Sequence, residues 1–98
     1  MPESVISYHF DPAHRQILAL NESGDQIGEI TYHAHGGFWG VNHTGVRPEY
    51  RGGGIARDLV ANLVAEARKA GVRLGATCSY AAKVMERTAE YRDVYSPE

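Results

Sequence analysis

Three consecutive glycines, residues 52–54, follow Arg51 and precede a stretch with helical apolar spacing that begins at Ile55. Because glycine loses more backbone freedom on folding than other residues, three in a row indicate an unusual backbone path or the close approach of a ligand. A helix that begins behind such a loop exposes unpaired N–H groups and a partial positive charge. This arrangement is typical of phosphate binding, and Arg51, Arg47 and Arg57 could pair with further phosphate oxygens. The alternative is that the glycines only permit a tight turn.

The spacing within this loop excludes two common phosphate-binding motifs. A Walker loop requires a Lys-Ser or Lys-Thr pair after the glycines, and none follows. The dinucleotide fingerprint requires a further glycine at the position that Arg57 occupies. The ligand class therefore has to come from other features of the chain.

Two other groups of residues could do chemistry. His33 and His35 would share one face of a strand and could bind a metal ion, but no third ligand has a recognisable spacing, so we predict no metal site. Cys78 is the only cysteine, which excludes an internal disulfide and gives no sign of an oxidising compartment.

The first half of the chain has the composition of short strands joined by turns. Simple alternation along residues 38–46 places His43 and Gly45 on one face, and Asn42 and Thr44 on the other. We expect strands at 4–10 (or an extended arm there), 15–21, 26–33 and 38–46, turns at 11–14 and 21–25, and a break at 33–37. Short connections between neighbouring strands predict an antiparallel meander.

The second half of the chain changes to a helical period. Its apolar stripe predicts a helix of about four turns that ends before Gly71, a C-cap signal; the stripe is Ile55, Leu59, Val60, Leu63, Val64 and Ala67. Residues 72–78 read as a short strand and residues 80–94 as a second, weaker helix. The predicted fold class is α+β, with a mostly antiparallel sheet, at least two helices and one right-handed crossover.

Length and charge limit the classes of function. A chain of 98 residues predicts a single domain over residues 1–98. A net charge of −2 and a pI near 6.2 argue against a nucleic-acid partner. The sequence contains no apolar run of the roughly 20 residues that cross a membrane, and its start has no secretory signal pattern, so we expect a cytoplasmic protein without a membrane partner.

Two stretches of the sequence resemble the small, single-domain members of the GNAT superfamily of N-acetyltransferases. They are HTGVRPEYRGGGIARDLV at 43–60 and CSYAAKVMERTAEY at 78–91, and the likeness extends over about residues 15 to 95. Within the first stretch, Arg51, Gly54 and Ala56 match the superfamily pattern Q/R-x-x-G-x-G/A. In the second, Cys78 and Tyr80 match a Cys-x-Tyr motif of the small members.

The resemblance implies a fold, a ligand and a set of site residues. The fold would be a minimal GNAT fold that lacks the two N-terminal helices on the acceptor side, and the ligand would be acetyl-CoA. Cys78 and Tyr80 would lie close to the thioester. The residues expected to bind the cofactor, with Val46 near the pantetheine, are Val46, Arg47, Arg51, Gly52, Gly53, Gly54, Ile55 and Ala56.

The sequence departs from the family pattern at two kinds of position. Gly45 stands where the small members commonly carry a glutamate proposed to deprotonate the acceptor amine. In the N-x-x-A-x-x-x-Y frame of larger GNAT enzymes, Cys78 replaces the asparagine and Met85 replaces the tyrosine. These departures leave the expected cofactor binding in place but remove the family's acid and base.

Amine acylation by a thioester needs a proton acceptor, a polarised carbonyl and aligned reactants. The proton acceptor could be His43, Glu49 or a water chain, and His43 could equally be an ordinary strand histidine. Tyr80 could hydrogen-bond the coenzyme, donate a proton to the leaving sulfur or pack in the core. Cys78 could accept the acetyl group, line the site or be buried. The candidate catalytic residues are therefore Cys78, Tyr80 and His43.

These observations predict an N-acetyltransferase that binds acetyl-CoA and acetylates an amine of a protein or a small molecule. A non-catalytic CoA-binding or acetyl-CoA-binding module is the alternative, because Gly45 and Met85 remove side chains expected near the chemistry. A general nucleotide-phosphate binder is a third possibility. The acceptor and the oligomeric state do not follow from the sequence.

Overall fold

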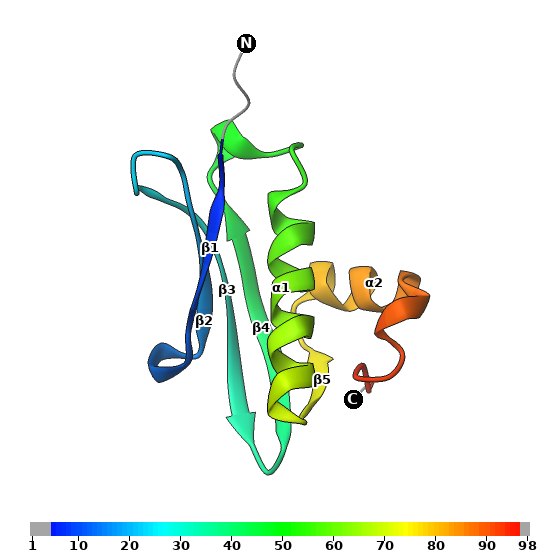
Figure 1. Cartoon of the computed structure of the whole chain (residues 1–98). Helices are drawn as coiled ribbons and strands as arrows, with labels where there is room; N and C mark the ends of the chain where they lie inside the picture. The colour runs from blue at the N-terminus through cyan, green and yellow to red at the C-terminus, as the bar shows by residue number, and fades with distance from the viewer. Residues whose placement is uncertain (1–4, 97–98) are drawn as a thin grey trace.

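The structure, a computed structural model that describes residues 5–96, combines a five-stranded sheet with two α-helices (Figure 1). The strands are β1 (Ser7–Asp11), β2 (Gln16–Leu20), β3 (Gln26–His35), β4 (Phe38–Val46) and β5 (Arg73–Ala76). The helices are α1 (Ile55–Ala70) and α2 (Ser79–Arg87), and 3-10 turns occur at Pro12–His14, Pro48–Tyr50 and Ala89–Tyr91. Within residues 5–96 no helix precedes β1, and the predicted α+β class is confirmed.

The sheet has its strands in chain order. β1 to β4 form an antiparallel meander, and β5 joins the edge of β4 in parallel after α1 has crossed between them. The meander and the crossover helix were both predicted from the sequence. The expected first strand began at Ser4, which lies outside the described residues.

β4 and β5 pair along only part of their length. Their register ends at Val41 opposite Ala76, and the amides of Thr77 and Cys78 both donate to the Val41 carbonyl, at 2.9 and 3.2 Å. β4 continues to Val46, and Figure 1 shows that this upper part of β4 runs without β5 beside it. The two strands therefore separate beyond Val41, well before β4 reaches the loop that leads into α1.

α1 provides most of the apolar side chains that cover the sheet. The six residues of its predicted stripe are the buried residues of the helix, which confirms the prediction. They join one cluster with residues from every strand but β1, from α2 and from Val94. Gly71 ends the helix with a left-handed φ of 71°, as expected of a C-cap glycine. Burial of each large apolar side chain contributes about 1.5–3 kcal/mol, so the stripe fixes the helix on the sheet.

Two predicted boundaries are wrong. β3 does not break at residue 33 but continues to His35, because Gly36 and Gly37 alone make the turn, with φ of 56° and 77°. The second helix ends at Arg87 rather than near residue 94. The chain instead returns to the edge of β5, where the Leu74 amide donates to the Val94 carbonyl at 2.8 Å. This pairing outweighs the weak helical pattern of the last residues.

Across residues 5–96, the structure contains no helix with the length and the apolar character needed to cross a membrane.

Candidate functional site

The glycine loop leaves the start of α1 open. Gly52 and Gly54 have φ of 87° and 85°, a left-handed backbone that side-chain-bearing residues rarely adopt. Gly54 is the N-cap of α1, where no side chain caps the helix, and its carbonyl accepts the first helical bond from the Asp58 amide at 2.9 Å. The N–H groups of the first turn are therefore left without a side-chain cap, as anion binding at a helix N-terminus requires.

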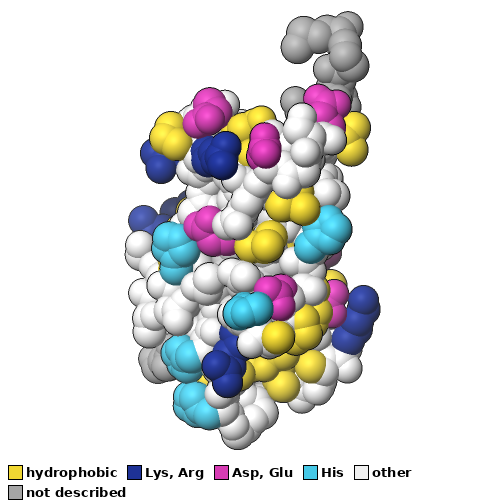
Figure 2. Space-filling model, turned by 90° about the vertical axis from the view of Figure 1, so that its left-hand side faces the viewer, with side chains coloured by type: hydrophobic (Ala, Val, Ile, Leu, Met, Phe, Trp, Pro, Cys, Tyr) yellow, Lys and Arg dark blue, Asp and Glu magenta, His cyan; other side chains and the backbone are white. Residues whose placement is uncertain are grey.

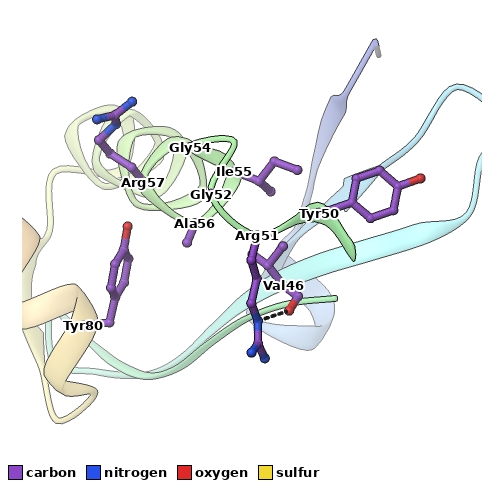
Figure 3. Close-up of a pocket in the computed structure, with 9 residues that line it drawn as sticks. All are labelled: Val46, Tyr50, Arg51, Gly52, Gly54, Ile55, Ala56, Arg57 and Tyr80. Atoms are coloured by element: carbon purple, nitrogen blue, oxygen red, sulfur yellow. Dashed lines mark hydrogen bonds between the residues drawn. The ribbon is translucent and has the colours of Figure 1, made fainter. Parts of the chain in front are cut away.

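A cavity of about 310 Å³ lies over this loop (Figure 3). It brings together seven of the predicted site residues with Tyr50 and Arg57; the seven are Val46, Arg51, Gly52, Gly54, Ile55, Ala56 and Tyr80. Residues from the end of β4, the start of α1 and the start of α2 thus meet around one space.

The two arginines of the loop have different positions. The Arg51 Nε donates to the Val46 carbonyl at 3.1 Å, and Figure 3 shows its side chain directed away from the α1 terminus. The guanidinium of Arg57 lies beside the loop, since a Cβ at Gly54 would be 3.1 Å from its Nη2. Arg57 is therefore the cation nearer to the glycines, although the family pattern points to Arg51.

Tyr80 faces the α1 terminus from the first turn of α2 (Figure 3). Its side chain is partly open to solvent, with 40% of the residue exposed. Burial raises the pKa of its hydroxyl above the ordinary 10.0, an effect that Arg57 opposes and Asp58 adds to. The hydroxyl is therefore protonated at neutral pH and can donate a proton or a hydrogen bond.

A second cavity adjoins the first and shares Val46 and Arg51 with it. His43 and Arg47 line this cavity. So does Glu29 of β3, which the sequence analysis did not single out. Nε2 of His43 and Oε2 of Glu29 are 2.8 Å apart.

Other candidates lie outside both cavities. Cys78 is half-buried at the N-cap of α2, with its Sγ 3.8 Å from the Thr44 hydroxyl oxygen. Gly53 and the exposed Glu49 line neither cavity. The His33 and His35 rings stack with centroids 5.3 Å apart, and within residues 5–96 no three His, Cys, Asp or Glu side chains are grouped to bind a metal.

Comparison with known proteins identifies this arrangement. Residues 16–94 match the family model for GCN5-related N-acetyltransferases. Because the match extends over most of the chain, the protein belongs to the GCN5-related N-acetyltransferase (GNAT) family. No curated protein sequence matches.

Solved structures agree with this assignment. An NMR structure of a GCN5-like candidate N-acetyltransferase from Staphylococcus aureus is 26% identical, with a TM-score of 0.73 over 100% of this chain and 93% of that one. A GCN5-related N-acetyltransferase from Sphaerobacter thermophilus is 28% identical over 62% of this chain and 20% of its own, with a TM-score of 0.58. A GNAT family enzyme of Escherichia coli, in complex with CoA, shares the fold at 16% identity and a TM-score of 0.58, over 74% of this chain and 61% of its own.

Proposed function

We propose that this protein is an N-acetyltransferase that takes acetyl-CoA as donor and an amine as acceptor. The observation that carries the proposal is the junction of two cavities at Val46 and Arg51, one over the glycine loop and the other lined by polar side chains. The first would hold the donor and the second the acceptor. Membership of the GNAT family and the CoA complex of the Escherichia coli relative support the choice of donor.

The residues of the glycine loop suit a pyrophosphate. Side chains at Gly52 and Gly54 would be strained at their φ values, so a backbone free of side chains lies in front of the uncapped N–H groups. Arg57 would add a charge-assisted contact to a phosphate oxygen. We keep the predicted cofactor-binding residues except two: Arg47, which lines the second cavity, and Gly53, which lines neither cavity.

Two features of the chain would promote transfer. Bound acetyl-CoA supplies an activated acetyl group as a thioester. The part of β4 beyond Val41 has no β5 neighbour, so backbone N–H groups there could polarise a carbonyl placed in the split. Tyr80, protonated at neutral pH, could donate to the leaving sulfur.

Ligand binding and thiol release test the proposal. Thermal unfolding should shift with acetyl-CoA and CoA but not with ATP or NAD. A ligand at about 100 times its Kd adds about 2.7 kcal/mol, and each kcal/mol moves the midpoint of a domain this size by roughly 4–8 °C. Arg57→Ala should reduce the shift more than Arg51→Ala, with Arg87→Ala as control. The absence of any shift would refute the proposal.

Turnover is tested with a panel of amines, namely polyamines, lysine peptides and amino acids. Free thiol should appear from acetyl-CoA only when one of these amines is added.

A non-catalytic CoA-binding module is the second candidate. Met85 is 1% exposed and contributes to the core, so no hydroxyl stands at the position where larger GNAT enzymes carry their tyrosine. Binding of acetyl-CoA without thiol release from any amine would support this candidate. A cytoplasmic location stays a prediction from the sequence.

A further inference from the structure

A carboxylate and an imidazole from neighbouring strands form a polar chain in the second cavity. Oε2 of Glu29 is 2.8 Å from Nε2 of His43, while the Gln26 side-chain amide donates to the other carboxylate oxygen at 3.1 Å. An ionised carboxylate can only accept hydrogen bonds, so Nε2 of His43 carries the proton in this pair. In the neutral ring, Nδ1 is then the nitrogen with a free lone pair.

The pair occupies space that a side chain at residue 45 would otherwise need. A Cβ at Gly45 would overlap Oε2 of Glu29 and would lie 2.9 Å from Nε2 of His43. Glu29 is the strand partner of Gly45, so its carboxylate reaches across from β3 into the place beside β4 that Gly45 leaves empty. Although residue 45 is a glycine, this cavity still contains a carboxylate, because Glu29 of the neighbouring strand β3 supplies one.

The position of the pair allows contact with an acceptor. The side chain of His43 is 57% exposed and that of Glu29 is 28% exposed. Their cavity adjoins the glycine-loop cavity through Val46 and Arg51. Figure 2 shows histidine side chains spread over the side of the molecule opposite α2, where they are open to solvent. Arg47 and Arg51 are the cations that line the same cavity and would disfavour a bound ammonium over a neutral amine.

We propose that Glu29 and His43 together take the proton from the acceptor amine, with His43 as the base and Glu29 as its positioning residue. This inference rests on the proposed N-acetyltransferase function. The acceptor ammonium gives one proton to Nδ1 of His43, and the neutral nitrogen forms a C–N bond to the acetyl carbonyl carbon. The C–S bond breaks with its electron pair on sulfur. The second nitrogen proton reaches the thiolate through Tyr80 or water, and His43 returns its proton to solvent.

The ring tautomer of His43 is the first readout, and it needs neither donor nor acceptor. In two-dimensional 1H–15N NMR of the histidine ring, the wild type should show the Nε2–H tautomer of neutral His43. Glu29→Gln should raise the share of the Nδ1–H tautomer relative to the wild type, because a neutral amide oxygen accepts the Nε2 proton more weakly than a carboxylate. Glu22→Gln, a matched change in the exposed turn before β3, should leave the tautomer unchanged. Equal tautomer shares in the wild type and in Glu29→Gln would refute the pairing.

Turnover is the second readout, measured with spermidine, a lysine peptide and free amino acids as acceptors. General base catalysis contributes about 10²–10⁴-fold. Glu29→Gln and His43→Gln should therefore lower kcat by about 10²-fold or more, with acetyl-CoA binding retained. Glu29→Ala should be as slow as these two variants, because it removes the carboxylate that orients His43. Glu22→Gln should keep the wild-type rate.

The results separate this inference from the proposed function. A wild type that binds acetyl-CoA but releases no thiol with any acceptor would refute both. If the wild type turns over and Glu29→Gln or His43→Gln is as fast, only the pair is refuted. A loss of turnover in Glu49→Gln but not in Glu29→Gln would assign the base to the loop before the glycines. Thermal unfolding of Glu29→Gln and His43→Gln checks that both variants fold.

Discussion

Tyr80 lines the glycine-loop cavity, where we propose that its hydroxyl protonates the leaving sulfur. We predict that Tyr80→Phe lowers kcat by at least tenfold while acetyl-CoA binding changes little, because the phenyl ring keeps its packing. Since burial raises the pKa of this hydroxyl above the ordinary tyrosine value, it stays protonated around neutral pH, and the ratio of wild-type to variant rates should be constant there and fall only in strongly alkaline solution. Steady-state rates across this pH range test the prediction. Tyr91→Phe, in the 3-10 turn after α2, is the matched control. A ratio near one would assign Tyr80 to packing alone.

Cys78 is half-buried and lines neither cavity, which favours packing over acetyl transfer. Its Sγ lies 3.8 Å from the Thr44 hydroxyl. We therefore predict direct transfer, with Cys78→Ala retaining turnover within a few-fold and no acetylated protein in intact mass spectra after incubation with acetyl-CoA. An acetyl adduct that Cys78→Ala abolishes would instead establish a covalent intermediate.

At the scale of elements, the glycine loop contains two neighbouring positions that differ in whether they tolerate a side chain, Gly53 and Gly54. Gly54 has a φ of 85°, where a side chain costs about 1–2 kcal/mol, and its Cβ would also press on Arg57. Gly53 lies outside the left-handed region, and its Cβ would meet the Tyr50 carbonyl at an ordinary 3.7 Å. Gly54→Ala should therefore lower the free energy of unfolding in urea and weaken acetyl-CoA binding, whereas Gly53→Ala should do neither. Equal effects at both positions would contradict this account.

Sequence patterns predicted the elements better than the register between them. Two glycines make the β3–β4 turn, and His35 pairs with Phe38 beside it. If the two strands paired without a bulge from there, Glu29 would lie opposite Thr44. Asn42 adds one residue to β4, so Glu29 faces Gly45 and shares a face with His43. Because of the same bulge, the Thr31 hydroxyl donates to the Asn42 side-chain oxygen, so Asn42 lies on the same face of β4 as His43. The predicted alternation of faces along residues 38–46 is therefore wrong at Asn42. A single-residue bulge has no reliable composition signal, and the pair could not be found without the structure.

The glycine loop, in contrast, was predictable from the chain itself. The φ requirement of Gly52 and Gly54 and the stripe that starts at Ile55 are local properties, which sequence patterns record directly. The end of α2 was not predictable, because the hydroxyl of Thr88 bonds back to the Val84 carbonyl and the chain leaves to pair with β5. That choice depends on an edge strand that is distant from Thr88 in the sequence.

On the scale of the whole molecule, the topology brings the site together from three separate parts of the chain. The β3–β4 hairpin supplies the proposed base, the loop into α1 supplies the proposed phosphate site, and α2 supplies Tyr80. The position of α2 depends in turn on β5, since the described apolar residues of both helices and the sheet form one cluster. We therefore expect residues 1–98 to act as a single domain. Substitutions in the C-terminal segment, residues 88–96, should then affect the site through α2 and β5.

An ion pair between Arg68 and Asp93 joins the C-terminal segment to α1, and its contribution to stability can be tested by changing the pH. Arg68 at the end of α1 donates to both carboxylate oxygens of Asp93, at 3.0 and 2.8 Å, and this hydrogen bonding lowers the pKa of Asp93 below 3.8. A lowered carboxyl pKa stabilises the folded state above the unfolded pKa, and that stability is lost as the pH falls through the folded value. Asp93→Asn should therefore reduce the free energy of unfolding at pH 7 more than at pH 3. Because both groups are exposed, the effect should be small.

Hydrogen exchange localises the same effect and supplies its control. In Asp93→Asn the amides of Leu74 and Ser96, which pair β5 with the C-terminal segment, should exchange faster than in the wild type. Asp11, whose pKa is lowered mainly by a hydrogen bond from Gln16, is far from that segment in the sheet. Asp11→Asn should show a similar pH dependence of stability but unchanged exchange at those two amides. If Asp93→Asn leaves both exchange rates unchanged, the pair does not hold the segment, and the pairing with β5 alone positions it.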